Sequence, residues 1–212
     1  MSGNVPSWSE KGLVSHLHAY YNSTMSESTA KTALLVIDVQ ESFRHRPYFD
    51  GAELPAYFEA QNGLIQGCVR AGVPVVRIFH VDDEGAFSLA SGFVRPLDGL
   101  VEFAEATRVH KHRHSALAGT DLAAWLTQHG IGRVIVSGIR TEQCCETTTR
   151  AASDAGFAVD YVTDATLTFT MRHANGRTYS PAEIRERTEL VLAERFATIC
   201  SVGQAIGRAK TA

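Results

Sequence analysis

The sequence predicts an α/β fold, a three-layer α/β/α sandwich in which helices cover both faces of a six-stranded parallel sheet. Two observations predict it. Continuously apolar runs such as 33–37 and 133–137 are typical of strands buried on both faces. Stretches of helical spacing separate these runs, and strands that alternate with helices form parallel sheets. The 212 residues suffice for one such domain.

The expected elements alternate regularly along the chain. Strands are expected at 33–38, 75–79, 107–112, 133–137, 158–162 and 197–202, and helices at 55–71, 120–129, 142–155 and 181–196. Gly72 fits a helix C-terminus, and Thr120 and Thr141 are candidate N-caps. Residues 81–105 are expected to form a long loop with a short helix, and residues 166–179 an irregular lid or subunit interface.

Composition and charge exclude several classes of protein. A net charge of −3 and a pI of about 6.3 argue against nucleic acid or anionic membrane as partners, and no apolar run is long enough to span a membrane. Residues 1–31 are expected to be a helical or disordered extension of a domain at 32–212. The extension lacks a signal-peptide core, and the four cysteines form no disulfide pattern, so a cytoplasmic protein is expected.

Three reactive side chains follow strands of the expected sheet: Asp38 after the first, Lys111 near the end of the third and Cys144 after the fourth. In the strand order 3-2-1-4-5-6, strands one and four are neighbours where the order reverses, and ligands bind beyond the carboxyl ends there. Cys144 would lie in the first turn of a helix, whose dipole lowers a thiol pKa and favours a nucleophilic thiolate. Asp38 would be a general base and Lys111 a stabilising cation.

Each of these residues also has a structural interpretation. Cys144 can be an inert core residue, Asp38 a turn cap, and Lys111 part of a solvated strand edge. Cys145 lies about 100° further round the helix and is expected in the core.

Neighbouring residues are candidates for binding. Arg140 either binds a substrate carboxylate or reaches solvent. Phe43 and Tyr48 either line the mouth of a small-molecule pocket or anchor a loop. His110, His112 and His114 would share a strand face but lack a spaced fourth ligand, so no metal is expected there. Neither a GxGxxG nor a Walker A sequence follows any strand, and no cofactor is expected.

With these residues placed, the chain resembles the isochorismatase-like cysteine hydrolases. Residues 38–43 read Asp-Val-Gln-Glu-Ser-Phe, similar to the family's D-x-Q-x-x-F. Lys111 with Ser115-Ala116-Leu117 resembles K-x-x-x-S-A-F, with leucine in place of the phenylalanine. Residues 138–150 resemble G-V-A-T-x-x-C-V-x-x-T-A-R. The resemblance covers about residues 32–203.

The resemblance implies a catalytic triad of Cys144, Asp38 and Lys111. It also implies a cis peptide bond between Ile139 and Arg140, which makes the backbone N–H groups of Arg140 and Cys144 an oxyanion hole. The implied reaction is hydrolysis of the C–N bond of a small carboxamide, ureide or carbamoyl compound through a thioester, by a homo-oligomer.

Two departures from the family pattern affect this expectation. Nicotinamidases carry a metal-binding Asp-x-His after the second strand, whereas this chain has His80-Val81-Asp82-Asp83, so zinc and nicotinamidase activity are not expected. Isochorismatases that cleave a vinyl ether commonly lack the cysteine. Two alternatives stay open: vinyl-ether hydrolysis through Asp38 without the cysteine, and a non-catalytic binding or redox-sensing module with Cys144 as an oxidisable thiol.

Overall fold

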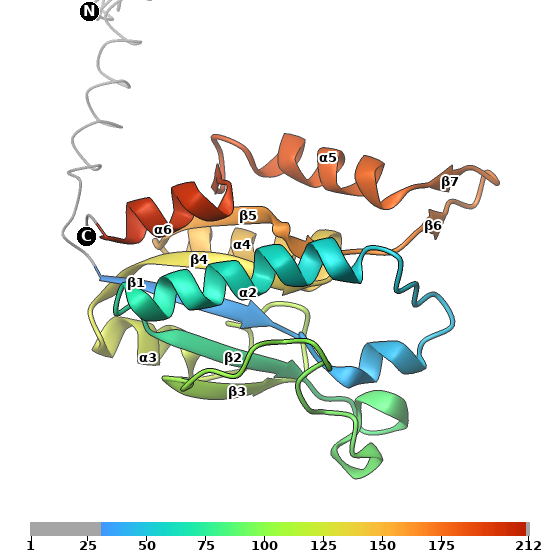
Figure 1. Ribbon diagram of the computed structural model, residues 1–212, viewed down its shortest axis with the longest axis horizontal. Helices are drawn as coiled ribbons and strands as arrows, with labels where there is room; N and C mark the ends of the chain where they lie inside the picture. Colours follow the sequence, from blue (N-terminus) through green and yellow to red (C-terminus); the bar gives the residue numbers. More distant parts are fainter. Residues whose placement is uncertain (1–30, 211–212) are drawn as a thin grey trace, which may run out of the picture.

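A computed structural model describes residues 31–210 (Figure 1). The predicted extension at 1–31 lies outside these residues except for Lys31, which begins the first strand. The main sheet contains, in spatial order, β3 (Thr107–Lys111), β2 (Val75–His80), β1 (Lys31–Ile37), β4 (Ile131–Ile139), β5 (Ala158–Leu167) and β8 (Thr198–Ile199). Every pairing in it is parallel. The predicted fold class and strand order are therefore confirmed.

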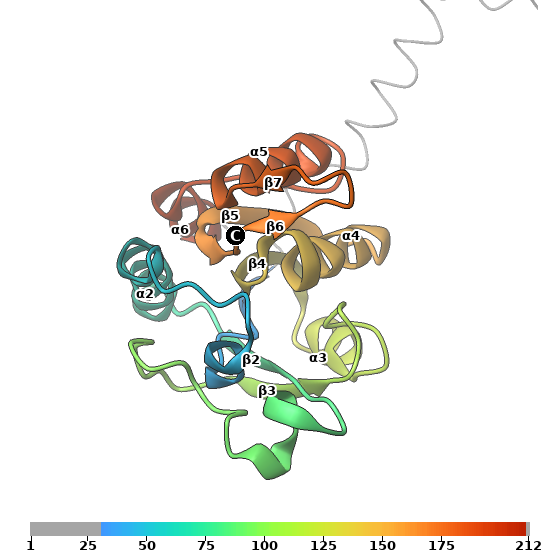
Figure 2. The ribbon, with the colours of Figure 1, turned by 90° about the vertical axis from the view of Figure 1, so that its right-hand side faces the viewer.

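Helices cover both faces of this sheet (Figure 2). One face carries α2 (Leu54–Arg70) and α6 (Val202–Lys210), and the other carries α3 (Leu122–Gln128), α4 (Glu146–Asp154) and, beside α4, α5 (Pro181–Leu192). Strand β1 shows why two cores form. Leu34 and Val36 are buried toward α2, and Leu35 and Ile37 toward α3 and α4, because successive side chains of a strand point to opposite faces.

Three short 3₁₀ helices lie in the loops that follow β1 and β2: Glu41–His45, Gly85–Phe87 and Leu89–Ser91. The stretch 166–179 is less irregular than expected. It completes β5 and then forms an antiparallel hairpin of β6 (Met171–Arg172) and β7 (Thr178–Tyr179). Its function as a lid or interface, and the predicted homo-oligomer, stay predictions. No helix within the described part of the chain is both long and apolar enough to cross a membrane.

The bounds of α5 show what local sequence decides and what it does not. Its start is a capping box: the Ser180 hydroxyl accepts from the Glu183 backbone N–H, and the Glu183 carboxylate accepts from the Ser180 N–H. Its end comes at Leu192 rather than at the predicted residue 196, because the backbone turns through positive φ at Glu194. Thr120 is not an N-cap, since α3 begins after Asp121.

Gly138 is required where β1 and β4 meet. Its φ is +128°, and a Cβ atom there would lie 2.0 Å from the carbonyl oxygen of Ile37. We expect Gly138→Ala to lower the free energy of unfolding by about 3 kcal/mol or more, measured by urea denaturation. The matched control is Gly63→Ala in α2, where a Cβ meets nothing within 4 Å and a gain of about 0.5–1 kcal/mol is expected. Equal effects of the two substitutions would contradict this assignment.

Candidate active site

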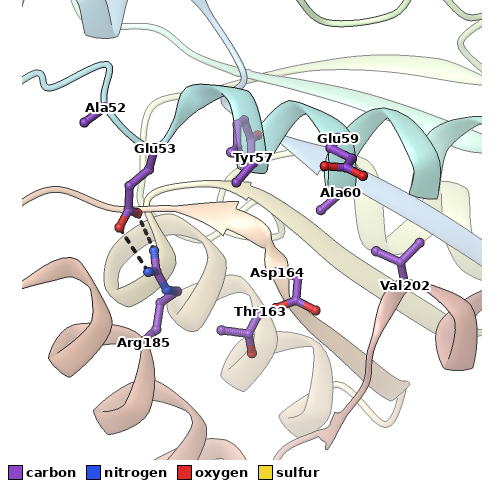
Figure 3. Close-up of a pocket in the computed structure, with 10 residues that line it drawn as sticks. Ala52, Glu53, Tyr57, Glu59, Ala60, Thr163, Asp164, Arg185 and Val202 are labelled. Atoms are coloured by element: carbon purple, nitrogen blue, oxygen red, sulfur yellow. Dashed lines mark hydrogen bonds and ion pairs between the residues drawn. The ribbon is translucent and has the colours of Figure 1, made fainter.

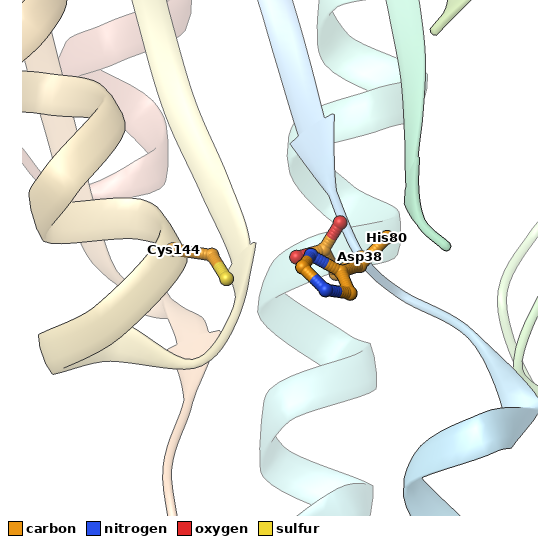
Figure 4. Close-up of side chains that lie close together, drawn as sticks. All are labelled: Asp38, His80 and Cys144. Carbon is orange, nitrogen blue, oxygen red and sulfur yellow. The ribbon is translucent and has the colours of Figure 1, made fainter. Parts of the chain in front are cut away.

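Four neighbouring strands each deliver one functional side chain to the carboxyl edge of the sheet. Lys111 ends β3, His80 ends β2, Asp38 follows β1, and Cys144 follows β4. Figure 4 shows Asp38 and His80 facing Cys144 across this edge. Asp38 adopts a φ of +53°, a conformation that non-glycine residues rarely adopt and that concentrates at functional sites.

Lys111 contacts both of the other predicted catalytic residues, Asp38 and Cys144. Its Nζ atom lies 2.7 Å from Asp38 Oδ2 and 3.4 Å from Cys144 Sγ, while Asp38 Oδ1 has no hydrogen-bond partner. Both Lys111 and Asp38 are fully buried. Burial by itself lowers the pKa of Lys111, but the charge of Asp38 and the hydrogen bonds to Asp38 and Cys144 outweigh it, so the pKa is raised. The amine is therefore a permanent cation.

His80 is a site residue that the sequence argument missed. Its Nδ1 lies 3.0 Å from Lys111 Nζ, and its Nε2 lies 2.9 Å from Asp82 Oδ1. An ammonium group can only donate, so Nδ1 must accept, and the ring proton is then on Nε2 and is donated to Asp82. His80 thus helps to hold Lys111 against Asp38. Its place at the end of the second strand, level with Asp38 and Lys111, is the signal that could have found it.

The turn that carries Cys144 differs from the predicted helix start. Residues Thr141–Cys145 form a π-helical turn, and α4 begins only at Glu146. Thr141 is not an N-cap, because its hydroxyl donates to Thr166 Oγ1 at 2.8 Å. Cys145 is fully buried in the core, as expected. The Ile139–Arg140 peptide bond is cis, as the resemblance implies.

The predicted lowering of the Cys144 pKa is wrong. Burial raises the pKa of this thiol, the nearby Asp38 carboxylate raises it further, and the Lys111 cation offsets only part of the shift. Cys144 is 7% exposed. The resting site therefore holds a neutral thiol between a carboxylate and an ammonium group, which needs a base before it can act as a nucleophile.

The donor set of this site does not fit a metal ion. Ligand atoms of Asp38, His80 and Cys144 lie within 4.8 Å of one another, a spacing that could hold one. The Lys111 ammonium, however, is 2.7 Å from Asp38 Oδ2 and 3.0 Å from His80 Nδ1. It already supplies positive charge to both ligands and would repel a second cation there. The three histidines do not share a strand face, because β3 ends at Lys111 and both His112 and His114 lie in the turn that follows it. His114 has Nδ1 3.8 Å from Cys144 Sγ, whereas His110 packs near Phe79.

Arg140 does not reach solvent. Its side chain is buried, with Nη2 2.9 Å from Glu142 Oε1 and Cζ 4.8 Å from the centre of the Tyr48 ring. Phe43 is also buried, 5.0 Å edge-on from Phe87. The loop after β1 therefore contributes an aromatic cluster beside the site, and Phe43 and Tyr48 both anchor that loop. A role for them in substrate binding stays a prediction.

A separate groove of about 690 Å³ lies between α2, β5 and α5 (Figure 3). An ion pair of 2.6 Å between Glu53 and Arg185 crosses one side of it. Asp38, Lys111 and Cys144 are not among its lining residues, so this groove is distinct from the catalytic cluster.

Comparison with known proteins places the chain in a family. Residues 32–194 match the isochorismatase domain. The uncharacterised isochorismatase family protein YrdC of Bacillus subtilis is 30% identical over 186 residues, which are 83% of this chain and 95% of the relative. Nicotinamidase 3 of Arabidopsis thaliana is 33% identical over 153 residues, 65% of this chain and 73% of the relative.

Solved structures of isochorismatase-family proteins have the same fold as this chain. A protein from Chromobacterium violaceum, assigned to the isochorismatase-family hydrolases, superposes with a TM-score of 0.78 at 25% identity, covering 87% of this chain and 96% of the other. N-carbamoylsarcosine amidase from Thermoplasma acidophilum superposes with a TM-score of 0.65 over 81% and 96% of the two chains. At 21% identity the latter shows the shared fold alone. The sequence match over 32–194 and the shared architecture establish that this chain belongs to the isochorismatase family and is a hydrolase of that family.

Proposed function

We propose that the chain is a cysteine-dependent hydrolase that cleaves the C–N bond of a small carboxamide, ureide or carbamoyl compound through a thioester. One observation carries the proposal: the buried Lys111 ammonium lies within 2.7 Å of Asp38 and 3.4 Å of Cys144. This arrangement supplies a nucleophile, a base with a free oxygen atom, and a cation that stabilises the charge passed between them.

In the first half of the reaction, Asp38 takes the thiol proton while Cys144 Sγ attacks the carbonyl carbon. A C–S bond forms, and the carbonyl electron pair moves to oxygen. Lys111 compensates the negative charge on sulfur or carboxylate throughout. The backbone N–H groups of Arg140 and Cys144 would hold the oxyanion, each such donor being worth about 3 kcal/mol to the transition state.

In the second half, Asp38 returns its proton to the leaving nitrogen as the C–N bond breaks, and ammonia or an amine departs. Water then loses a proton to Asp38 and attacks the thioester carbon. The C–S bond breaks, and the Cys144 sulfur recovers the proton from Asp38. Each turnover thus restores the neutral thiol that burial favours.

Two considerations favour this reaction over the alternatives. Nicotinamidase 3 is similar to this chain in sequence, N-carbamoylsarcosine amidase shares its fold, and both names describe amide hydrolysis. A redox-sensing thiol should be exposed and ionised, whereas Cys144 is buried with a raised pKa. Lys111 beside Asp38 would also be superfluous in a sensor.

The direct test is ammonia release from a panel of small carboxamides, ureides and N-carbamoyl acids. We expect at least one class to release ammonia, and mass spectrometry of quenched reactions to find the acyl group on the peptide that contains Cys144. Cleavage of isochorismate without any acylated Cys144 would instead establish the vinyl-ether reaction and contradict the proposal.

A further inference from the structure

Arg140 and Glu142 form a second buried ion pair at the start of the turn that carries the nucleophile. Their side chains are only 8% and 10% exposed, with Arg140 Nη2 2.9 Å from Glu142 Oε1. The other carboxylate oxygen of Glu142 accepts a hydrogen bond of 2.6 Å from Thr168 Oγ1. The hydrolytic steps above use the backbone of Arg140 but neither of these two charged side chains.

The guanidinium of Arg140 has a buried donor without a partner, and the carboxylate of Glu142 has a buried acceptor, Oε1, which is in ion-pair contact but accepts no hydrogen bond. The Arg140 donor is Nε, which is buried and has no hydrogen-bond partner. The face of the guanidinium packs against aromatic rings, with Cζ 4.8 Å from the centre of Tyr48 and 5.7 Å from that of Phe169. Because buried donors are nearly always paired, this N–H is suited to an acceptor that the free protein does not supply.

A chain of aromatic contacts links Arg140 with the catalytic cluster. Phe169 lies 6.3 Å from Phe43, Phe43 lies 5.0 Å from Phe87, and Phe87 lies 5.9 Å from the ring of His80. His80 in turn contacts Lys111. Packed side chains therefore connect the guanidinium with the catalytic cluster, in addition to the short stretch of backbone between Arg140 and Cys144.

The buried charges of this region sum to zero. Lys111 is paired with Asp38, and Arg140 is paired with Glu142. A substrate carboxylate would add an uncompensated negative charge near two existing carboxylates, and unpaired buried charge is strongly unfavourable. A neutral acceptor, such as a carbonyl oxygen, could use Arg140 Nε without disturbing either pair.

We propose that the Arg140–Glu142 pair restricts the active site to neutral ligands, so that amides and ureides are favoured over the anionic N-carbamoyl acids. Arg140 Nε–H donates to an uncharged oxygen of the ligand, and Glu142 cancels the charge that would otherwise attract a carboxylate. The proposal replaces the expected carboxylate-binding role of Arg140. It rests on the proposed function only in identifying the ligand with the substrate.

Iodoacetamide and iodoacetate test this charge preference without a known substrate. The two reagents have nearly the same size. In both reactions the Cys144 thiolate attacks the reagent carbon, a thioether forms and iodide leaves that carbon. Because both rates are proportional to the ionised fraction of Cys144, this fraction cancels in the rate ratio. Rates would be measured at pH 8 by mass spectrometry, with fragmentation of the peptide that carries Cys144 to distinguish it from the adjacent Cys145. The neutral thiol N-acetylcysteine amide gives the intrinsic ratio of the two reagents.

For the wild-type protein, we expect the ratio of the iodoacetamide rate to the iodoacetate rate to be about tenfold higher than for that model thiol. The reason is that the carboxylate of iodoacetate would enter a site in which no unpaired cation compensates its charge. Glu142→Gln, which frees the positive charge of Arg140, should lower the ratio by about tenfold, and Arg140→Gln should raise it. The double substitution should return it to near the wild-type value. Glu53→Gln removes a carboxylate from another arginine pair, with Arg185, and should leave the ratio unchanged.

A wild-type ratio equal to that of the model thiol, or a ratio that Glu142→Gln does not lower, would overturn the proposal. A general disturbance of folding could not shift the ratio in opposite directions for the two single variants. Failure of the amide-hydrolase function would appear separately, as absence of ammonia release and of acylated Cys144, and would leave the alkylation ratios interpretable.

Discussion

Cys144→Ala is expected to abolish C–N bond hydrolysis, with kcat lowered by about 10⁴-fold or more, because no other group can form the thioester. Asp38 and Lys111 stay in place in this variant, so a mechanism in which Asp38 acts without the sulfur would survive. The measurement is ammonia release under saturating substrate, taken from the class that the wild-type protein hydrolyses. Retention of more than a small fraction of the wild-type rate would remove Cys144 from the mechanism.

Cys145→Ala is the matched control, since it makes the same chemical change one residue later. Cys145 is fully buried among core residues, and its backbone N–H, which donates to the Arg140 carbonyl, is not removed by the substitution. We expect a loss of about 1–2 kcal/mol in the free energy of unfolding from the small cavity, with kcat unchanged. Comparison of the two substitutions separates the catalytic effect of the Cys144 sulfur from the effect of the Cys145 sulfur on core packing.

The strand-end positions explain why three catalytic residues could be predicted from sequence. Asp38, Lys111 and Cys144 each follow an apolar run, and parallel strands bring their carboxyl ends to one edge. His80 satisfies the same rule, but a histidine at the end of a strand gives no local signal of its contact with Lys111. That contact joins residues 31 positions apart and depends on the final register of β2 and β3.

Long-range packing also overrode two local expectations. The Thr141 hydroxyl has the right place in sequence for an N-cap, yet β5 continues past a bulge and brings Thr166 within 2.8 Å of it. The Cys144 thiol was expected to ionise because of the helix that follows it. Desolvation and the Asp38 charge, neither visible in the local sequence, raise its pKa instead.

Lys111→Met is expected to have the largest effect on stability. It leaves the carboxylate of Asp38 fully buried without its cation, and breaking a buried ion pair in this way costs about 3–5 kcal/mol. Activity should fall as well, because no cation then offsets the negative charge that passes between Asp38 and the Cys144 sulfur. Urea denaturation measures the first effect, and ammonia release at permissive temperature measures the second.

A double substitution separates the two contributions of this ion pair. Asp38→Asn with Lys111→Met removes both buried charges and should recover most of the free energy of unfolding that either single change loses. It should remain inactive, since neither a base nor a stabilising cation is present. Arg95→Met breaks an exposed pair with Asp98 and should cost no more than about 1 kcal/mol. If Lys111→Met lowered the free energy of unfolding as little as Arg95→Met does, Lys111 would not be compensating the buried charge of Asp38. The role of Lys111 as the cation that holds this carboxylate ionised would then be contradicted.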